Sequence, residues 1–578
     1  MEAVKLHLSN KSSEEDEYLL VLELSEGDPF IGKKKKLLED NGLHPQGHVY
    51  LKNSSCSNLL NSTLKLLLQS ARIVCLDEIE LYFSEVDGNS SMRFHNPRIE
   101  LEALHTVLSL INKALSSGSD TVRDILQTLR DSAINMIREL GDKVRLETRI
   151  TTNHSCDYEK RLLHWAESNG VRTKLEVAYI EGAGRGAIAT EDLKVGDIAL
   201  EIPVSVIISE ELVYQSDMEL LLLQELTEVT KFNLENRRIH FPILENIDGI
   251  SLETMLLLWS MKEKHNNNSK FRFYFDPLPE VFNTGLSFGI NAIMALDGTL
   301  LLEEIVHAKE VFNPYIIFII IDMLQSIISL CYNGELYMWE QFLWACELWY
   351  SNGMKVIFPD GKLHTCLVPV AGFLNHSLCP HILHYGKVDL ATNSLKFPIS
   401  RPCDAGEQCY LSYGKFSSSH LVTFYGFLPG EDNPYDVIPL DLDAADTDCS
   451  SSSCPMPNWT NHMIRGTWMS KNQRIFHYGL PPPLLDHFRK AGSPMCQTDK
   501  HERLENELFV LESLHSTFQD MLETLDDTNL EDSTNSSSWD VKLGVEFRNI
   551  QRKIVSSIVD SCNSGFQLVE HELSKYKA

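Results

Sequence analysis

The alternation of apolar and polar positions divides the first 150 residues into stretches of different periodicity. Tyr18–Leu24 and Ile73–Phe83 are rich in apolar and β-branched residues, which predicts strands. In Leu101–Leu115 and Val122–Leu140 an apolar residue recurs every three or four positions, which predicts two amphipathic helices. We interpret residues 1–150 as an accessory domain, either α/β or mostly helical, without a motif that carries chemistry.

The pattern changes over residues 157–209. Tyr158–Asn169 predicts a helix, and short apolar runs separated by glycines follow it, which predicts a meander of short strands. Gly182, Gly184 and Gly186 lie in one tight connection, where the missing Cβ lets the backbone turn or approach something closely. Their spacing, with no helical pattern behind it, differs from that of a dinucleotide-binding loop.

The middle of the chain is mainly helical over residues 210–345 and returns to short strands over residues 346–440. The most apolar run is Ile316–Leu330, but Asp322 lies inside it and it is short for a bilayer. We interpret this run as a buried helix. Residues 441–474 lack periodicity and are rich in Ser, Asp and Pro, so they predict a linker.

The C-terminal residues 475–578 predict an all-α lobe. Apolar residues recur in two segments at heptad-like steps, at Leu504, Leu508, Leu511, Phe518, Leu522 and Leu525, and then at Phe547, Ile550, Ile554 and Ile558. The polar stretch Asp526–Trp539 separates the two segments. An antiparallel helical hairpin follows from this pattern, and the whole chain predicts an α+β protein of several domains.

Composition narrows the classes of function. A chain of 578 residues is too long for a single hydrophobic core, which predicts several domains. The 81 acidic and 51 basic residues give a formal net charge of −30. This charge argues against a nucleic acid as the main partner and suits a protein substrate with basic residues. The N-terminus is acidic within its first seventeen residues and lacks an apolar core. We therefore expect no chloroplast transit peptide and a cytoplasmic or nuclear location.

The cysteines predict no zinc site. The thirteen cysteines are scattered along the chain without a CxxC pair. His376, Cys379 and His381 are close in sequence, but no second pair of ligands accompanies them. Reduced thiols in a cytosolic or nuclear setting fit this distribution.

The richest stretch for chemistry is Val370–Phe427. Asn375 and His376 lie on a short apolar segment, Tyr413 ends an apolar run, and Tyr425 follows twelve residues later in a Tyr-Gly-Phe segment. Taken singly, each has a structural interpretation, since an asparagine often satisfies a turn and a tyrosine often packs half-buried. A phenol can orient a polar group without bringing a full charge.

In order and spacing, these residues resemble the C-terminal half of SET-domain protein methyltransferases. The likeness is greatest to the branch that includes the Rubisco large-subunit lysine methyltransferase and the actin-histidine methyltransferase. The resemblance implies a SET fold of short strands at residues 157–440, made of 157–209, a large helical insert at 210–345, and 346–440. It also implies that residues 475–578 form the helical substrate-binding lobe of this branch.

The same resemblance implies S-adenosylmethionine as the cofactor and assigns roles to residues. Those expected to bind the cofactor are Glu181, Gly182, Ala183, Asn375 and His376. Tyr413 matches the active-site tyrosine, while Tyr425 and Tyr385 would line the substrate channel. No metal is implied.

Two departures from the pattern keep alternatives open. Asn352 stands where relatives usually carry an arginine that helps to hold the cofactor, and Gly372 stands where the Rubisco-type enzyme has an aspartate. The leading hypothesis is a protein-lysine N-methyltransferase acting on a non-histone protein. A protein-histidine methyltransferase on the same scaffold and an inactive SET-fold binding protein are the alternatives. A membrane-associated helical protein would depend on Ile316–Leu330 alone.

Overall fold

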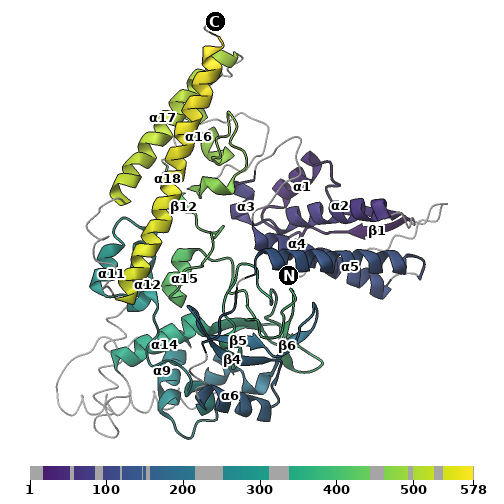
Figure 1. Ribbon diagram of the computed structural model, residues 1–578. Helices are drawn as coiled ribbons and strands as arrows, with labels where there is room; N and C mark the ends of the chain where they lie inside the picture. The colour runs from purple at the N-terminus through teal and green to yellow at the C-terminus, as the bar shows by residue number, and fades with distance from the viewer. Residues whose placement is uncertain are drawn as a thin grey trace, which may run out of the picture. The chain divides into compact units, whose positions relative to one another are not determined.

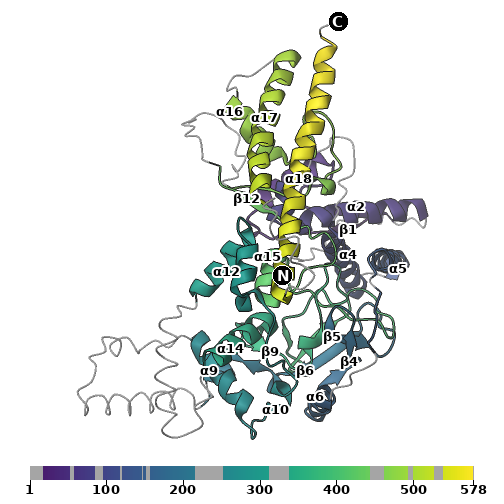
Figure 2. The same cartoon turned by 60° about the vertical axis from the view of Figure 1, so that its left-hand side comes forward.

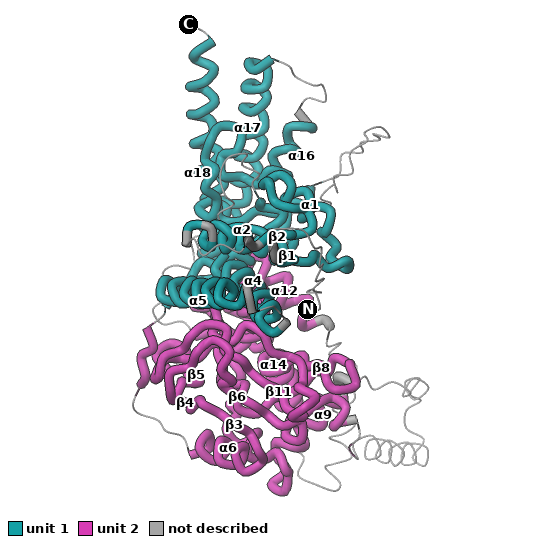
Figure 3. The backbone as a smooth tube through the Cα atoms, turned by 90° about the vertical axis from the view of Figure 1, so that its right-hand side faces the viewer, with its two compact units in different colours: residues 1–145, 430–537, 544–578 teal, residues 146–429, 538–543 magenta. Residues whose placement is uncertain are grey.

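The computed structural model consists of runs of helices and runs of short strands (Figure 1), so the predicted α+β class is confirmed. The structure describes residues 17–52, 57–84, 96–117, 120–145, 147–151, 157–214, 216, 252–311, 338–442, 461–492, 499–525 and 538–576. Two compact units divide the chain (Figure 3): unit 1 comprises residues 1–145, 430–537 and 544–578, and unit 2 comprises residues 146–429 and 538–543.

Unit 2 contains several small sheets. Its described strands are β3 (Arg172–Thr173), β4 (Leu175–Ile180), β5 (Gly184–Ala189), β6 (Ile198–Pro203), β7 (Ile208–Ser209), β8 (Gly353–Ile357), β9 (Leu363–Leu367), β10 (Val388–Asp389) and β11 (Ser394–Pro398). β4 and β5 form an antiparallel hairpin, and the other two sheets have the orders β10-β11-β6-β3 and β7-β9-β8. Strands from before and after the helical middle of the chain therefore pair with each other, as β6 does with β11.

Most helices of unit 2 lie, in the sequence, between strands β7 and β8. They are α6 (Asp157–Ser168), η1 (Val204–Val206), α7 (Glu210–Tyr214), α9 (Leu252–His265), α10 (Arg272–Phe275), η3 (Gly285–Ser287), α11 (Ile290–Ala295), α12 (Leu300–Val311), α14 (Trp339–Asn352), η4 (Ala371–Phe373) and α15 (Ser418–Tyr425). α9 and α14 lie side by side (Figure 2) and bury aromatic residues such as Trp259 and Phe342. Burial of each large apolar side chain contributes about 1.5–3 kcal/mol.

Two segments near the predicted site differ from the strand pattern that we expected at residues 346–440. Ser417 accepts the N–H of His420 and caps α15, so the segment that ends in Tyr425 is a helix. Gly426 has φ 75° and ends that helix in the left-handed conformation that glycine adopts without strain. The run before Tyr413 pairs only through isolated bridges, such as the parallel bridge between His376 and Leu411.

Unit 1 combines segments from both ends of the chain. Its described elements are β1 (Glu17–Val21), α1 (Ile31–Asp40), β2 (His48–Lys52), α2 (Ser57–Cys75), α3 (Glu78–Tyr82), α4 (Pro97–Ser117), α5 (Asp120–Lys143), β12 (Ile438–Leu440), β13 (His462–Ile464), η5 (Thr467–Met469), α16 (Pro482–Gly492), α17 (Lys500–Leu525) and α18 (Trp539–Ser574), although the first residues of α18 belong to unit 2. The predicted helices at α4, α5, α17 and α18 are confirmed. The predicted strand at Ile73–Phe83 is wrong, because Asp77 accepts the N–H of Glu80 and begins α3.

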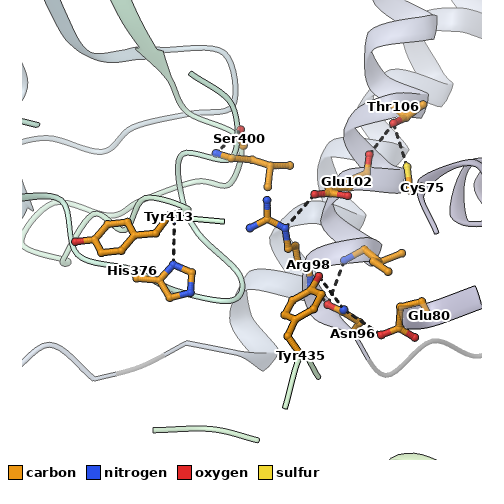
Figure 4. Close-up of polar contacts among 12 residues, drawn as sticks. Cys75, Glu80, Asn96, Arg98, Glu102, Thr106, His376, Ser400, Tyr413 and Tyr435 are labelled. Carbon is orange, nitrogen blue, oxygen red and sulfur yellow. Dashed lines mark hydrogen bonds and ion pairs between the residues drawn. The ribbon is translucent and has the colours of Figure 1, made fainter. Parts of the chain in front are cut away.

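Buried polar contacts join the two ends of the chain within unit 1. The Tyr82 hydroxyl pairs with Nδ1 of His462 at 3.0 Å and accepts the N–H of Met463 at 3.2 Å. Asn96 donates from Nδ2 to the Tyr435 hydroxyl at 3.2 Å (Figure 4). Because buried polar groups are costly to leave unpaired, these bonds make the N- and C-terminal segments parts of one unit.

Some expectations concern residues that the structure does not describe. Ile316–Leu330, most of the predicted linker and most of the polar stretch at 526–539 lie outside the described residues. In the part of the chain that the structure does describe, no helix has both the length and the apolar character needed to cross a bilayer.

Tyr82→Phe tests the bonds that join the two ends. The substitution leaves Nδ1 of His462 and the N–H of Met463 without their buried partner, and we expect unit 1 to lose about 1–3 kcal/mol of stability. Faster hydrogen exchange at the Met463 amide and a lower denaturation midpoint would measure this loss. Tyr50→Phe is the control, because the Tyr50 side chain is 54% exposed. Unchanged exchange at Met463 would contradict the role given to the hydroxyl.

Candidate functional site

The Asn375-His376 segment lies beside the extended run that leads to Tyr413. The carbonyl oxygen of Asn375 accepts the N–H of Leu411 at 2.8 Å, and Ser377 donates its N–H to Leu411 at 3.3 Å. On its other side the run is joined to β5, because Cys409 donates its N–H to the carbonyl oxygen of Ala187 at 2.8 Å. Three segments that are far apart in the sequence are thus held in parallel or antiparallel contact.

The side chain of Asn375 connects this segment to the glycine hairpin. Its Nδ2 donates to the carbonyl oxygen of Arg185 in β5 at 3.0 Å. A Cβ at Gly186 would lie 2.8 Å from Nε2 of Gln408 and 3.2 Å from Nδ2 of Asn375. The close approach predicted for these glycines is therefore real at Gly186, whereas Gly182 has φ 77° and serves the turn.

His376 positions the backbone of Tyr413. Its Nδ1 accepts the N–H of Tyr413 at 3.1 Å (Figure 4), and the two rings lie 5.2 Å apart between centroids. Because Nδ1 is an acceptor, the neutral imidazole carries its proton on Nε2. The ring also lies 6.4 Å from Phe427, so the segment after α15 contributes to the same site.

Three tyrosines gather at this site. Tyr413 donates its hydroxyl proton to the carbonyl oxygen of Leu374 at 3.0 Å, and its ring stacks on Tyr425 with centroids 4.9 Å apart. Burial raises the pKa of Tyr413 well above its usual value, and the neighbouring Tyr425 and Tyr385 add to the effect. Burial and Tyr385 raise the pKa of Tyr425 to about 12. The hydroxyls of Tyr413 and Tyr425 therefore stay neutral, and the Tyr413 oxygen keeps lone pairs to accept a hydrogen bond.

The residues predicted to bind the cofactor fall into two groups, one at the hairpin tip and one beside Tyr413. Glu181, Gly182 and Ala183 are exposed at the tip of the β4–β5 hairpin. Asn375 and His376 lie next to Tyr413. β5 of this hairpin is bonded to Asn375 through Arg185 and to the run before Tyr413 through Ala187. The tip is joined to these contacts by the chain.

Sequence reasoning missed Arg185 and Phe373. The Arg185 guanidinium lies 5.5 Å from the centroid of the Phe373 ring and pairs with Glu159 at 3.2 Å. It also donates to the carbonyl oxygen of Pro277. An arginine between two glycines was the available signal for Arg185, but its partners are separated from it by 26 or more positions.

The two departures noted in the sequence meet at one place. A Cβ at Gly372 would lie 3.0 Å from Oδ1 of Asn352, whose Nδ2 donates to Ser351 at 2.8 Å. Asn352 ends α14 and Gly372 lies in η4. The two positions that depart from the expected pattern are therefore neighbours in the structure.

A buried group of possible metal ligands lies beside the run that leads to Tyr413. The ligand atoms of His381, Cys403 and Cys409 all lie within 4.8 Å of one another. Nδ1 of His381 accepts the N–H of Tyr410 at 3.0 Å, so the neutral ring carries its proton on Nε2. A cation at Nε2 would force that proton to Nδ1, where it would face the N–H of Tyr410. This geometry argues against a metal at the group.

Glu407 borders the same group as a buried carboxylate. Its Oε1 lies 3.6 Å from Nε2 of His381, and its Oε2 accepts the N–H of Asp404 at 3.1 Å. Burial alone would raise the pKa of Glu407, but His381, the Asp404 N–H and Arg401 outweigh it and lower the pKa to about 2. The charged form is therefore favoured in the folded protein.

The depressed pKa predicts a stability that depends on pH. Its contribution is fully present above the ordinary carboxyl value of 4.5 and is lost as the pH falls toward 2. We expect Glu407→Gln to destabilise unit 2 by about 1–3 kcal/mol at pH 7, with a smaller difference from wild type at pH 3. Denaturant unfolding at several pH values measures both, and Glu176→Gln, at an exposed position, is the control. A difference that does not shrink on acidification would contradict the prediction.

Comparison with known proteins shows sequence relationships. Residues 25–152 match the family model described as Rubisco LSMT substrate-binding. The chain is 24% identical over 319 residues to the actin-histidine N-methyltransferase of Gallus gallus, covering 54% of this chain and 50% of that protein. It is 25% identical over 284 residues to the chloroplastic [fructose-bisphosphate aldolase]-lysine N-methyltransferase of Arabidopsis thaliana, covering 47% and 51%. The chain thus spans about half the length of the curated relatives it matches.

A solved structure described as the SET domain of LSMT bound to lysine and AdoHcy also matches, with a TM-score of 0.47 and 18% identity over 74% of this chain and 96% of that chain. The family-model match lies at the N-terminal end of unit 1, whereas the resemblance had suggested residues 475–578 for a substrate-binding lobe. The resemblance drawn from the sequence is confirmed at the level of relationship. The chain is similar to protein methyltransferases that include histidine and lysine enzymes, and residues 25–152 match the Rubisco LSMT substrate-binding model.

Proposed function

We propose that the protein is an S-adenosylmethionine-dependent protein N-methyltransferase that modifies a lysine of a non-histone protein. The observation that carries the proposal is the neutral tyrosine cluster beside the Asn375-His376 segment, with the Tyr413 hydroxyl bonded to Leu374. The curated relatives add support, because their names describe N-methyltransferases that act on protein side chains.

The hairpin tip and the Asn375-His376 segment offer polar groups that suit the binding of S-adenosylmethionine. S-adenosylmethionine supplies an electrophilic methyl group on a sulfonium. The hairpin tip at Glu181, Gly182 and Ala183 offers exposed backbone, and a Cβ at Gly182 would meet no heavy atom within 4 Å. Asn375 donates one N–H to Arg185 and retains its amide oxygen as an acceptor toward a ligand. These residues and His376 would hold the donor.

The tyrosines would align the nucleophile. The Tyr413 oxygen can accept a hydrogen bond from an amine, since its own proton is bonded to Leu374. Tyr425 stacks on Tyr413, and Tyr385 lies close enough to raise the pKa of both phenols. An amine that has lost its proton to water could then be directed at the methyl carbon, with rate gained from alignment and exclusion of water.

A histidine is the second candidate for the modified residue. Several of the curated relatives are named actin-histidine N-methyltransferases, and an imidazole nitrogen can be methylated by the same in-line displacement. The third candidate is a binding protein without turnover, which the adjoining Asn352 and Gly372 favour.

We also propose that the partner is a protein, with no nucleic acid or membrane involved, and that the protein works in the cytoplasm or nucleus. The net charge of −30 supports a substrate segment with basic residues. The match of residues 25–152 to a substrate-binding model supports unit 1 as the place where the substrate protein is recognised.

Asn375→Ala tests the cofactor site. The substitution removes the bond to Arg185 that holds the glycine hairpin beside the Asn375-His376 segment. We expect S-adenosylmethionine to bind at least about tenfold more weakly, a loss of about 1.4 kcal/mol in calorimetry. Asn169→Ala is the matched control, because that amide also donates to a backbone carbonyl but is exposed. Equal binding by wild type and Asn375→Ala would refute the site, and no binding by wild type would favour the binding-protein alternative.

Tyr413→Phe tests the reaction. We expect transfer of a radiolabelled methyl group into a protein of a cell extract to fall about 10–100-fold, because the hydroxyl that orients the nucleophile is lost. Tyr158→Phe, at an exposed position of unit 2, should keep wild-type transfer. Hydrolysis of the labelled protein then identifies methyl-lysine, which we expect, or methyl-histidine, which would replace lysine with the second candidate. Equal labelling by wild type and Tyr413→Phe would end the role proposed for Tyr413.

A further inference from the structure

Glu347 on α14 is a buried carboxylate that the proposed reaction does not use. Its side chain belongs to a residue that is only 2% exposed. Its Oε1 accepts hydrogen bonds from the hydroxyls of Thr284 at 2.7 Å and Ser287 at 2.6 Å. Burial raises the pKa of Glu347, although both hydroxyls and the charge of Lys309 oppose the rise. A buried carboxylate is costly unless it is well bonded, so these two bonds have a structural consequence.

Both hydroxyls belong to the short 3₁₀ turn η3 and its cap. Thr284 caps η3 by accepting the N–H of Leu286 at 3.3 Å, and Ser287 is the last residue of the turn. A three-residue 3₁₀ turn has weak internal hydrogen bonding. The carboxylate of Glu347 therefore anchors a turn that its own backbone would hold poorly.

The anchored turn lies directly against α15. A Cβ at Gly285 would lie 2.8 Å from Cα of Thr423, and a Cβ at Gly426 would overlap the carbonyl oxygen of Asn283. Two glycines, one on each side, thus allow backbone to touch backbone. Because no flexible side chain lies between them, displacement of the turn must be transmitted to the end of α15.

The end of α15 carries Tyr425. Gly426 follows it and returns its N–H to Leu421 at 2.9 Å, so the backbone around Tyr425 is fixed by the helix cap and by the turn together. The Tyr425 ring stacks on Tyr413 with an angle of 30° between planes. A small movement of the helix end would change that stacking.

We propose that Glu347 is a positioning residue: by holding η3 through Thr284 and Ser287, it sets the place of Tyr425 against Tyr413 at one wall of the substrate channel. That Glu347 fixes the position of Tyr425 follows from the contacts alone. The effect of this position on the reaction rests on the proposed methyltransferase function.

The test uses the full-length protein with 3-fluorotyrosine at position 425 and reads the ¹⁹F resonance, which ring stacking on Tyr413 influences. Glu347→Ala removes the acceptor of both hydroxyls, and we expect a shifted or broadened resonance together with a kcat at least about tenfold lower at saturating substrates. Glu347→Gln keeps Oε1 as an acceptor and should restore both readouts to within about twofold. Glu340→Ala, on the same helix but exposed, should resemble wild type.

The outcomes distinguish failure of the positioning role of Glu347 from failure of the proposed methyltransferase function. An unchanged resonance and kcat in folded Glu347→Ala would overturn the positioning role, and so would a Gln variant as impaired as the Ala variant. If Glu347→Ala does not fold, Ser287→Ala removes one of the two bonds, and its resonance must differ from that of wild type. An unchanged resonance in folded Ser287→Ala would then overturn the positioning role. If wild type transfers no methyl group, the proposed function fails, while the resonance still decides whether Glu347 sets the position of Tyr425.

Discussion

The hydrogen bonds of Asn375 and His376 are the constraint on which the site depends. The Asn375 amide reaches Arg185, its carbonyl oxygen accepts from Leu411, and the His376 ring accepts from Tyr413. Each bond contributes only about 0.5–1.5 kcal/mol net. Two adjacent residues nevertheless connect a glycine hairpin, their own segment and the run before the tyrosine, alongside the backbone bond between Cys409 and Ala187. The position of the Tyr413 hydroxyl follows from this connection.

Local patterns predicted the parts of this arrangement that local physics controls. The amphipathic periodicity of α4 and α5 and the glycines of the β4–β5 hairpin were sufficient for a correct prediction. Ser417 and Gly426 contained the capping signals of α15, but the β-branched and aromatic residues between them favoured a strand. Arg185 and Glu347 could not be found, because their roles come from partners 26 to 190 positions away.

Unit 1 contains segments from both ends of the chain, which the sequence predicted as separate domains. The segment that matches a substrate-binding model lies before the strands of unit 2 in the sequence, and the heptad-patterned helices lie after them. Tyr82 with His462, Glu80 with Arg465 and Asn96 with Tyr435 bond these two ends within one unit. The segment that matches the family model is therefore folded together with the C-terminal part of the chain. The domain boundaries drawn from the sequence stay predictions.

The two residues that favour a binding protein without turnover lie together in the structure. Asn352 and Gly372 are two departures along the chain, and they face each other at the end of α14 and at η4. The tyrosine cluster is held by separate contacts: Tyr413 by Leu374 and His376, and Tyr425 by the cap of α15. Burying phenol hydroxyls is unfavourable unless they are bonded, at about 1–3 kcal/mol each. Tyr413 and Tyr425 are stacked and neutral, and the Tyr413 proton is bonded to a backbone carbonyl. This arrangement supports the proposed enzyme over the alternative of a binding protein.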